Sequence, residues 1–422
     1  MNTTQKKIKF QLTILNFLEF FVFGAWLLSF GKYMHATLEF SGSEIGAVFS
    51  TLAWASLVMP GIMGLIADKW ISPNKLFALS HIIGAFILVW MAQQHAFLPL
   101  FVVTLLYLLL YMPSIALDNT ISYCILTKND LDVVKTFPPI RVWGTIGFII
   151  ATWITDLAGW GTSYMQFYFA AVASLVLGLY TFTLPDCPPD KTSQKTLAQA
   201  LGLDALALFK DKKLAIFFIF SMLLGAALQI TNMWGEAFLH DFGKFEEFKD
   251  AFIVKYNGVV MSLSQISETI FILTIPFFLK RYGIKKVMLM SMLAWFLRFG
   301  LFAVGSPEGI GAIAIILSMI VYGMAFDFFN ISGSLFVEKE VDTKIRASAQ
   351  GLFMMMTNGF GALMGAYLSG FVIDLFREGN MVNWQAVWTV FAIYALVIAI
   401  LFAILFKYKH NPAEELEIKH QV

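Results

Sequence analysis

Charged residues are scarce in this chain. Asp, Glu, Lys and Arg make up 14% of its 422 residues, whereas a soluble protein has about 25%. Hydrophobic residues make up 59%, and the mean hydropathy is +0.74. This composition excludes an ordinary soluble domain and indicates a membrane protein. The net charge of +1 argues against a nucleic-acid partner.

Cysteine is nearly absent as well. Cys124 and Cys187 are the two cysteines, and we expect them to form neither a disulfide framework nor a metal site. The chain has no Gly-x-x-x-x-Gly-Lys-Ser/Thr loop, which excludes an ATP-driven pump. It also has no His-Glu-x-x-His or Cys-x-x-Cys motif, which argues against a metal-dependent membrane enzyme. We therefore do not expect an enzyme.

Long apolar runs fill most of the chain. A run of roughly 20 apolar residues crosses a bilayer as a helix. About twelve such runs occur, near residues 10–33, 44–67, 75–94, 97–124, 139–158, 163–184, 214–238, 254–279, 286–305, 310–333, 346–375 and 384–406. The sequence thus predicts an all-α polytopic membrane protein.

A polar stretch, residues 185–213, separates the first six spans from the last six. We therefore predict an N-terminal six-helix bundle over residues 1–185, a central loop over 186–213, a C-terminal six-helix bundle over 214–407 and a tail over 408–422. If the N-terminus is inside, about 22 Lys and Arg residues lie inside and about 5 outside. This bias predicts that both termini, the central loop and the tail are cytoplasmic.

The two halves echo each other. Span five begins IRVWGTIGF at Ile140, and span eleven begins IRASAQGLF at Ile345. Matching positions in two six-span halves indicate a duplicated bundle. Sites in transporters built this way lie near mid-membrane, where the repeats meet.

The tenth span carries an acid. Asp327 lies in MIVYGMAFDFFNISGSLFV, and such a residue rarely faces lipid because a centred Asp costs about 2.5–3.5 kcal/mol. Tyr322 and Phe326 are four residues apart, and Asp327 and Asn330 are three apart, so a helix places them on neighbouring turns. This stripe suits a polar solute that contains a ring. The alternative is a structural pair with a basic residue of another helix.

Other spans carry polar residues at similar depth. They are Glu19 in span one, Asp118 and Asn119 in span four, Arg141 and Thr145 in span five, Gln229 and Asn232 in span seven, Gln265 and Glu268 in span eight, Arg298 in span nine, and Gln350 and Asn358 in span eleven. Spans three, six and twelve have almost none. We assign no role to Glu19 or Asp118.

Several long strings carry a family resemblance. FPPIRVWGTIGF, FFIFSMLLGAALQITNMWG, SQISETIFILTIPFFLKRYGIK and MIVYGMAFDFFNISGSLFVEKEV resemble the bacterial nucleoside:proton symporter family, the nucleoside and xanthosine permeases of the major facilitator superfamily. The resemblance covers nearly the whole chain. It implies the major facilitator fold, import of nucleosides by alternating access with a proton as coupling ion, no cofactor, a monomer surrounded by lipid, and a bacterial inner-membrane location.

The resemblance also implies site residues. Substrate contact falls on Arg141, Thr145, Phe148, Gln229, Asn232, Gln265, Glu268, Tyr322, Phe326 and Asp327. Asp327 is the first candidate for proton coupling and Glu268 the second. Aromatic rings suit stacking on a base, and amides donate and accept hydrogen bonds as base and sugar edges require.

Structural readings compete with several of these assignments. Gln229 and Asn232 suit helix association equally well, and Glu268 suits a bridge to Arg141. Arg298 is expected to snorkel to the outer surface, and the glycines of span eleven to pack against another helix. At the cytoplasmic side, Asp68 and Arg346 are expected to form a gating latch.

Two other functions fit the same residues. One is proton symport of another small polar solute, such as a sugar or a nucleobase. The other is a membrane sensor that binds nucleosides without moving them.

Overall fold

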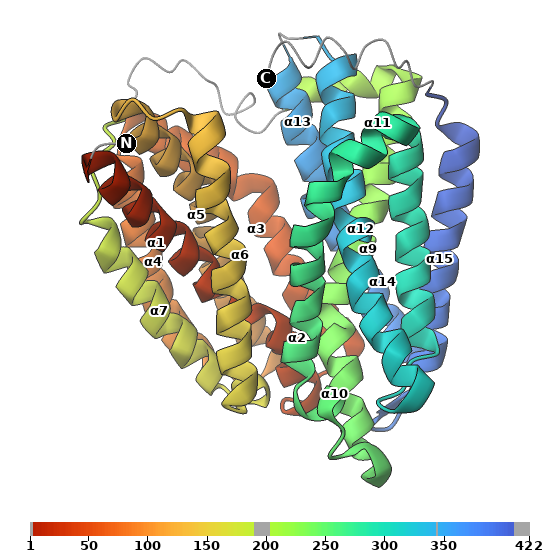
Figure 1. Ribbon diagram of the computed structural model, residues 1–422. Coiled ribbons are helices and arrows are strands. Elements are labelled where there is room, and N and C mark those ends of the chain that lie inside the picture. The colour runs from red at the N-terminus through yellow and green to blue at the C-terminus, as the bar shows by residue number, and fades with distance from the viewer. Residues whose placement is uncertain (1–2, 190–202, 343–344, 409–422) are drawn as a thin grey trace. The chain divides into compact units, whose positions relative to one another are not determined.

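The computed structural model describes residues 3–189, 203–342 and 345–408 (Figure 1). The chain forms two compact units, residues 1–201 and 202–422. The predicted tail, apart from its first residue, lies outside the described residues, and so does the middle of the predicted central loop.

The first unit contains six spans. They are α1 (Thr3–Gly24) continued by α2 (Leu27–Ala36), α3 (Gly42–Lys69), α4 (Pro73–Met91), α5 (Phe97–Lys128), α6 (Val133–Leu157) and α7 (Met165–Thr181), with a short 3-10 turn η1 (Trp160–Thr162) before α7. Side-chain caps fix some of the helix starts. Ser41 and Glu44 form a capping box at α3, and the Asp132 side chain accepts the backbone N–H of Lys135 at α6.

The second unit also contains six spans. They are α9 (Lys212–Asp241), the two parts of α11 (Asn257–Ala303), α12 (Gly309–Glu340), α13 (Arg346–Met354) continued by a π-helical segment η5 (Met355–Gly361) and α14 (Ala362–Leu375), and α15 (Trp384–Leu405). Short elements link them: η2 (Leu203–Lys210), η3 (Phe242–Lys244), η4 (Glu246–Phe248), α10 (Phe252–Lys255), and the strands β1 (Arg377–Glu378) and β2 (Met381–Val382), which pair antiparallel.

The helices confirm the predicted all-α polytopic fold. In the described residues, nine helical stretches are long and apolar enough to cross a membrane. One of them, α11, covers two predicted spans and turns at Gly283, whose φ of 75° is a backbone conformation that favours glycine. The other two predicted spans are the shorter helix α7 and the interrupted helix from α13 to α14.

The same pattern of helix pairs occurs inside each unit. In the first unit, α1 packs on α6, α3 on α5, and α4 on α7. In the second unit, α9 packs on η5 and α14, while α11 packs on α12 and on α15. Numbered by span, each unit therefore pairs its first span with its fifth, its second with its fourth and its third with its sixth. This repetition agrees with the duplication that the sequence suggests.

Glycines allow the closest of these approaches. A Cβ at Gly24 or Gly147 would collide with backbone of the partner helix in the α1–α6 pair. A Cβ at Gly225 of α9 would likewise collide with the carbonyl oxygen of Thr357 in η5, and Gly361 meets the backbone of α9. The prediction that glycines of span eleven serve packing is confirmed at Gly361. Small residues let membrane helices approach in this way.

We expect Gly225→Ala to destabilise the protein, by about 1–3 kcal/mol for an overpacked contact of this kind. The measurement is the melting temperature of the purified protein in detergent. Gly300→Ala is the matched control, because a Cβ at Gly300, also within a helix of the second unit, would meet nothing within 4 Å among the described residues beyond the backbone of its own helix. Equal melting temperatures for the two variants would contradict this account of the α9–η5 contact.

The expectation for the cysteines is wrong. Cys124 of α5 and Cys187 are joined by a disulfide, with their Cα atoms 6.3 Å apart. The chain after α7 returns to the ends of α4 and α5: Asn74 Nδ2 donates to Pro185 O at 3.1 Å, and Lys128 Nζ donates to Asp186 O at 2.9 Å. These contacts place Cys187 beside α5. The two cysteines are 63 positions apart in the sequence, and this spacing did not indicate that they pair.

Candidate functional site

Three predicted contact residues lie on one stretch of α6 in the first unit. Arg141, Thr145 and Phe148 are spaced by four and three residues, so they occupy one side of the helix, and all three are partly exposed. The guanidinium of Arg141 lies over the ring of Phe20, 3.8 Å from its centroid. The Phe148 ring meets the Phe23 ring edge-on at 6.2 Å. This side of α6 therefore offers a cation, a hydroxyl and an aromatic face.

Two amides lie on α9 in the second unit. Gln229 is 5% exposed, and Asn232 is partly exposed. Their spacing of three residues places them on adjacent turns of one side. Gly365 of α14 packs against this helix beside Gln229, because a Cβ at Gly365 would lie 3.0 Å from Gln229 Cβ. Gln229 therefore lies where α9 and α14 approach each other closely.

The first part of α11 carries Gln265 and Glu268. Both side chains are partly exposed, and their spacing of three residues places them on one side of the helix. Ser264 and Ser267 of the same stretch face α12 instead, because Ser267 Oγ donates to Ile320 O and Ser264 Oγ contacts the sulfur of Met319. The amide and the acid are therefore separated from the packing serines.

The tenth span, α12, brings together the aromatic and acidic residues that its sequence pattern predicted. The rings of Tyr322 and Phe326 are nearly parallel, at 15°, with centroids 6.3 Å apart. Tyr322 also meets Trp295 of α11 edge-on at 5.9 Å. Asp327 is 4% exposed, and in the described part of the chain its Oδ2 atom has no hydrogen-bond partner. A buried carboxyl without a cation partner is costly when charged, and such groups in membrane helices usually have a function.

A small cavity of about 20 Å³ lies inside the second unit. Its walls are Leu224, Gly225, Leu228, Trp295, Ala325, Phe326, Phe329, Asn330, Thr357 and Asn358. Of the predicted contact residues, it includes Phe326. It also includes Trp295, which the sequence reading did not select, since a tryptophan in a span is equally typical of the lipid interface. Asn330 and Asn358 add amide groups to the same cavity.

Arg298 does not snorkel, which corrects the expectation for span nine. Its side chain is fully buried, and its guanidinium lies 4.5 Å from the centroid of Tyr322 and 5.1 Å from that of Phe302. Nη1 donates to Ser318 O at 2.8 Å and to Ser264 Oγ at 3.3 Å. Partners on neighbouring helices hold the charge inside the unit, and its position beside Tyr322 fixes that ring by a cation–π contact.

The two predicted gating residues lie near helix ends. Asp68 is at the end of α3, and Arg346 is at the start of α13. Arg346 pairs with Glu338 of α12, with Nη1 and Oε1 2.8 Å apart, and its Nε donates to Val341 O at 3.3 Å. A latch between Asp68 and Arg346 stays a prediction.

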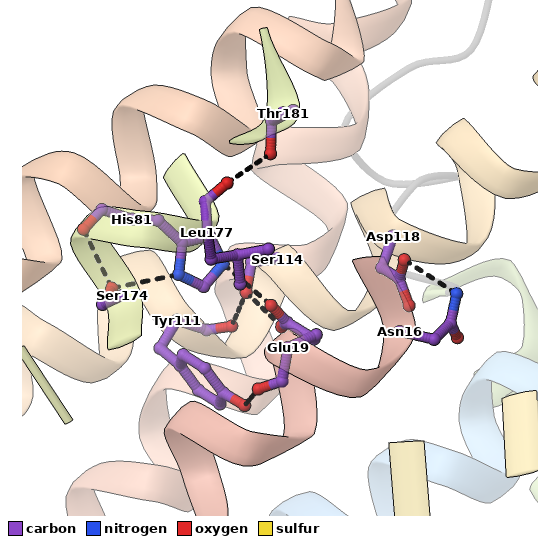
Figure 2. A network of polar contacts seen from close by, with 9 residues as sticks. All are labelled: Asn16, Glu19, His81, Tyr111, Ser114, Asp118, Ser174, Leu177 and Thr181. Atoms are coloured by element: carbon purple, nitrogen blue, oxygen red, sulfur yellow. Dashed lines mark hydrogen bonds and ion pairs between the residues drawn. The ribbon is translucent and has the colours of Figure 1, made fainter. Parts of the chain in front are cut away.

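Sequence reading missed a buried polar network in the first unit (Figure 2). Glu19 of α1 pairs with His81 of α4, with Oε2 and Nε2 2.8 Å apart, and both side chains are almost fully buried. His81 belongs to the third span, which the sequence analysis counted as nearly free of polar groups. The histidine at the centre of FALSHIIGAF was the available signal, because ionisable residues inside membrane spans are rare.

Among the described residues, no group of three or more His, Cys, Asp or Glu side chains is placed to hold a metal ion. The polar groups of the predicted site are amides, a hydroxyl, a phenol, a guanidinium and two carboxyls. Together with aromatic faces, they suit binding of an uncharged solute that has a flat ring and several hydrogen-bonding groups.

Comparison with known proteins identifies close relatives. The chain is 54% identical over 404 residues to the nucleoside permease NupG of Escherichia coli (strain K12), which covers 96% of this chain and 97% of the permease. It is 52% identical over 415 residues to the xanthosine permease of the same organism, covering 98% and 99% of the two chains.

Solved structures agree with these sequence matches. The crystal structure of the nucleoside transporter NupG superposes with a TM-score of 0.91 at 53% identity, over 97% of this chain and 100% of that chain. A bacterial homologue of the human lysosomal transporter Spinster, in an inward-facing and unoccupied conformation, shares the fold, with a TM-score of 0.70 at 12% identity over 96% of this chain and 98% of that one.

Residues 6–411 match the sequence profile of the nucleoside H⁺ symporter family. This match, together with identities above one half over nearly the full length, confirms the resemblance seen in the sequence. The chain therefore belongs to the nucleoside H⁺ symporter family, and it is a multi-pass membrane transporter with the major facilitator fold and not an enzyme.

Proposed function

We propose that this protein imports nucleosides into a bacterial cell together with protons, by alternating access, with Asp327 as the proton-coupling acid and Glu268 as the second candidate. The observation that carries this proposal is the arrangement on α12. The parallel rings of Tyr322 and Phe326 stand next to a buried carboxyl whose Oδ2 has no hydrogen-bond partner among the described residues. Two rings on which a base can stack and a carboxyl that can accept a proton therefore lie within one and a half turns of α12.

The polar side chains of the proposed site form two sets, one that binds the nucleoside and one that carries the proton. Gln229, Asn232 and Gln265 both donate and accept hydrogen bonds, which a base edge and a ribose require. Arg141, Thr145 and Phe148 contribute a cation, a hydroxyl and a ring from the first unit. A nucleoside that enters a dry site must find partners for each of its polar groups, since unpaired groups lower affinity.

The energy for accumulation comes from the proton. A nucleoside is neutral, so a cycle that carries it with one proton moves one positive charge. That charge gains about 2.3 kcal/mol per 100 mV of membrane potential, which corresponds to a nucleoside gradient of roughly fifty-fold. Asp327 accepts the proton when the site opens outward and releases it when the site opens inward.

The proposal includes an orientation and an assembly state. The bias of about 22 inside against about 5 outside Lys and Arg residues supports cytoplasmic termini. The protein acts as a monomer in the bacterial inner membrane. The latch between Asp68 and Arg346 closes the cytoplasmic side during the cycle.

Uptake of labelled uridine by the purified protein in sealed vesicles tests this function. With an acidic exterior, we expect uridine to concentrate inside, and a protonophore to reduce the ratio of inside to outside concentration to one. Adenosine and other nucleosides should compete, whereas free bases and sugars should compete poorly. Uridine that binds without crossing the membrane, or stronger competition by sugars, would contradict the proposal.

A further inference from the structure

The cavity in the second unit has walls from four segments that are far apart in the sequence. Leu224 and Leu228 belong to α9, Trp295 to the second part of α11, Phe326 to α12, and Asn358 to the π-helical segment η5. The cavity volume is about 20 Å³, and a cavity of this kind needs roughly 10–15 Å³ to admit one water molecule. It therefore has space for one group of that size, such as an amino group or a carbonyl oxygen, and not for a ring.

Two amide side chains in the cavity wall, Asn330 of α12 and Asn358 of η5, make no hydrogen bond in the described part of the chain. Both are partly exposed, and each can donate two hydrogen bonds and accept two. The hydroxyl of Thr357 in the same wall differs, because its Oγ1 donates to Phe353 O of its own helix at 3.0 Å. The two amides therefore keep their bonding capacity for a ligand.

An amide of the same two spans shows the alternative, structural role. Gln350 of α13 donates from Nε2 to Ser334 O of α12 at 2.8 Å, and this bond joins the tenth and eleventh spans. Ser334 follows Asn330 by four residues, and Gln350 precedes Asn358 by eight, so the two kinds of amide are within about two turns of each other on each span. Polar side chains often join membrane helices in this way. Asn330 and Asn358 form no such bond among the described residues, so helix association does not account for them.

Asn358 is the middle residue of the π-helical segment, Met355–Gly361. π-Helical turns are rare and occur frequently at functional sites. Helix α9 approaches this segment closely at Gly225, where a Cβ would collide with the carbonyl oxygen of Thr357. Gly225 and Thr357 both line the cavity. The close approach of the two backbones therefore places Asn358 in the cavity wall.

Phe326 relates the cavity to the proposed substrate site. Its side chain is partly exposed, stacks on Tyr322 and also lines the cavity. Asn330 follows Phe326 by one turn on the same side of α12. The exocyclic groups of a base project beyond its ring, so those of a base stacked on Phe326 extend past the edge of the phenyl ring. The cavity borders that ring.

We propose that Asn330 and Asn358 determine which bases this protein accepts, by binding in the cavity the exocyclic group on the side of the base far from the ribose. The inference rests on the proposed function for the identity of the ligand as a nucleoside. An amide suits this task because one end donates and the other accepts, so its rotation matches either a carbonyl oxygen or an amino group. Asparagine pairs with base edges in nucleic acids in the same way.

A nucleoside that lacks the exocyclic group tests this subsite in the unaltered protein. Uridine has a carbonyl group and cytidine an amino group at one ring atom far from the ribose, where pyrimidin-2-one riboside has only hydrogen. A site built to bond a substrate group discriminates against an analogue without it, because the protein groups are then unpaired. We expect pyrimidin-2-one riboside to bind about tenfold more weakly than uridine or cytidine. Competition with labelled uridine on the purified protein in detergent measures these affinities without any need for transport.

Asn330→Leu and Asn358→Leu remove the amides and keep side chains of similar size. The double variant should bind uridine about tenfold more weakly and lower the ratio of the two affinities, uridine to pyrimidin-2-one riboside, to near one. Each single variant should lower the ratio part of the way. A general disturbance of the site weakens both ligands alike, so a change in the ratio reports a direct contact.

Gln350→Met is the matched control. It removes the structural amide bond to Ser334 O and leaves both asparagines in place. The melting temperature should fall, and the ratio of about ten between uridine and pyrimidin-2-one riboside should remain. A control variant that lowered this ratio as far as the two asparagine variants do would overturn the inference.

Two further results would overturn it. One is equal affinity of the wild-type protein for uridine, cytidine and pyrimidin-2-one riboside, which needs no variant to fold. The other is an unchanged ratio in both single variants. Uptake into vesicles is measured separately: a protein that binds these nucleosides with the expected ratios and does not move them would refute the proposed function, and the subsite would stand. A protein that binds no nucleoside would refute both.

Discussion

Replacing Asp327 with asparagine is expected to abolish accumulation of uridine while preserving its exchange. Asparagine has nearly the shape of a protonated aspartate but cannot release a proton. The cycle of a symporter depends on that release, because the empty carrier must return without the proton. Exchange of internal for external uridine needs only the loaded states, so it should continue at a rate comparable to that of the wild type.

Two parallel assays on the same vesicles measure this effect. The first follows uridine concentration inside under an imposed pH gradient, where the variant should reach a ratio near one. The second follows exchange without a gradient. Asp204→Asn is a control, because Asp204 is exposed in η2. Accumulation that persists in Asp327→Asn but disappears in Glu268→Gln would move the coupling role to Glu268.

Phe326→Leu is expected to weaken substrate binding strongly. Phe326 is partly exposed, lines the cavity of the second unit and is stacked on Tyr322. Stacking of a base on an aromatic ring contributes about 1–3 kcal/mol, and 1.4 kcal/mol corresponds to about tenfold in affinity. The KM for uridine should therefore rise about tenfold or more, with a smaller change in the maximum rate.

Phe328→Leu is the matched control for that variant. Phe328 lies two residues further along α12, is fully buried, and packs with Ile275 and Val287 in a hydrophobic core. Its ring meets Phe278 at 4.9 Å. The change should lower the melting temperature and leave the KM unaltered. Equal KM values for the two variants would contradict a role for Phe326 in stacking.

Much of the fold was predictable because the lipid bilayer imposes a simple rule on sequence. A span needs roughly 20 apolar residues, and each of the twelve predicted spans is largely helical, although the first and the eleventh are interrupted. The polar residues selected on α6, α9, α11 and α12 are also placed as their spacing indicates, since helical periodicity determines which side chains share a side. These features depend on local sequence alone.

The remaining features depend on which helices are neighbours. Arg298 can be buried because its guanidinium lies over the ring of Tyr322 and donates to the carbonyl oxygen of Ser318, both on the adjacent helix. Glu19 has its histidine partner 62 positions away on α4, and Cys187 reaches Cys124 only because the chain folds back after α7. Local periodicity contains no information about such partners. The histidine was visible in the sequence, but its importance was not.

The most direct test of the central claim is simultaneous measurement of proton and uridine entry into vesicles containing the wild-type protein. The claim is that one buried carboxyl beside an aromatic surface couples the two movements. We predict that uridine added outside makes the medium more alkaline, in a fixed ratio to the uridine that enters, and that Asp327→Asn removes this proton movement. Uridine that enters and concentrates with no accompanying proton would contradict the account.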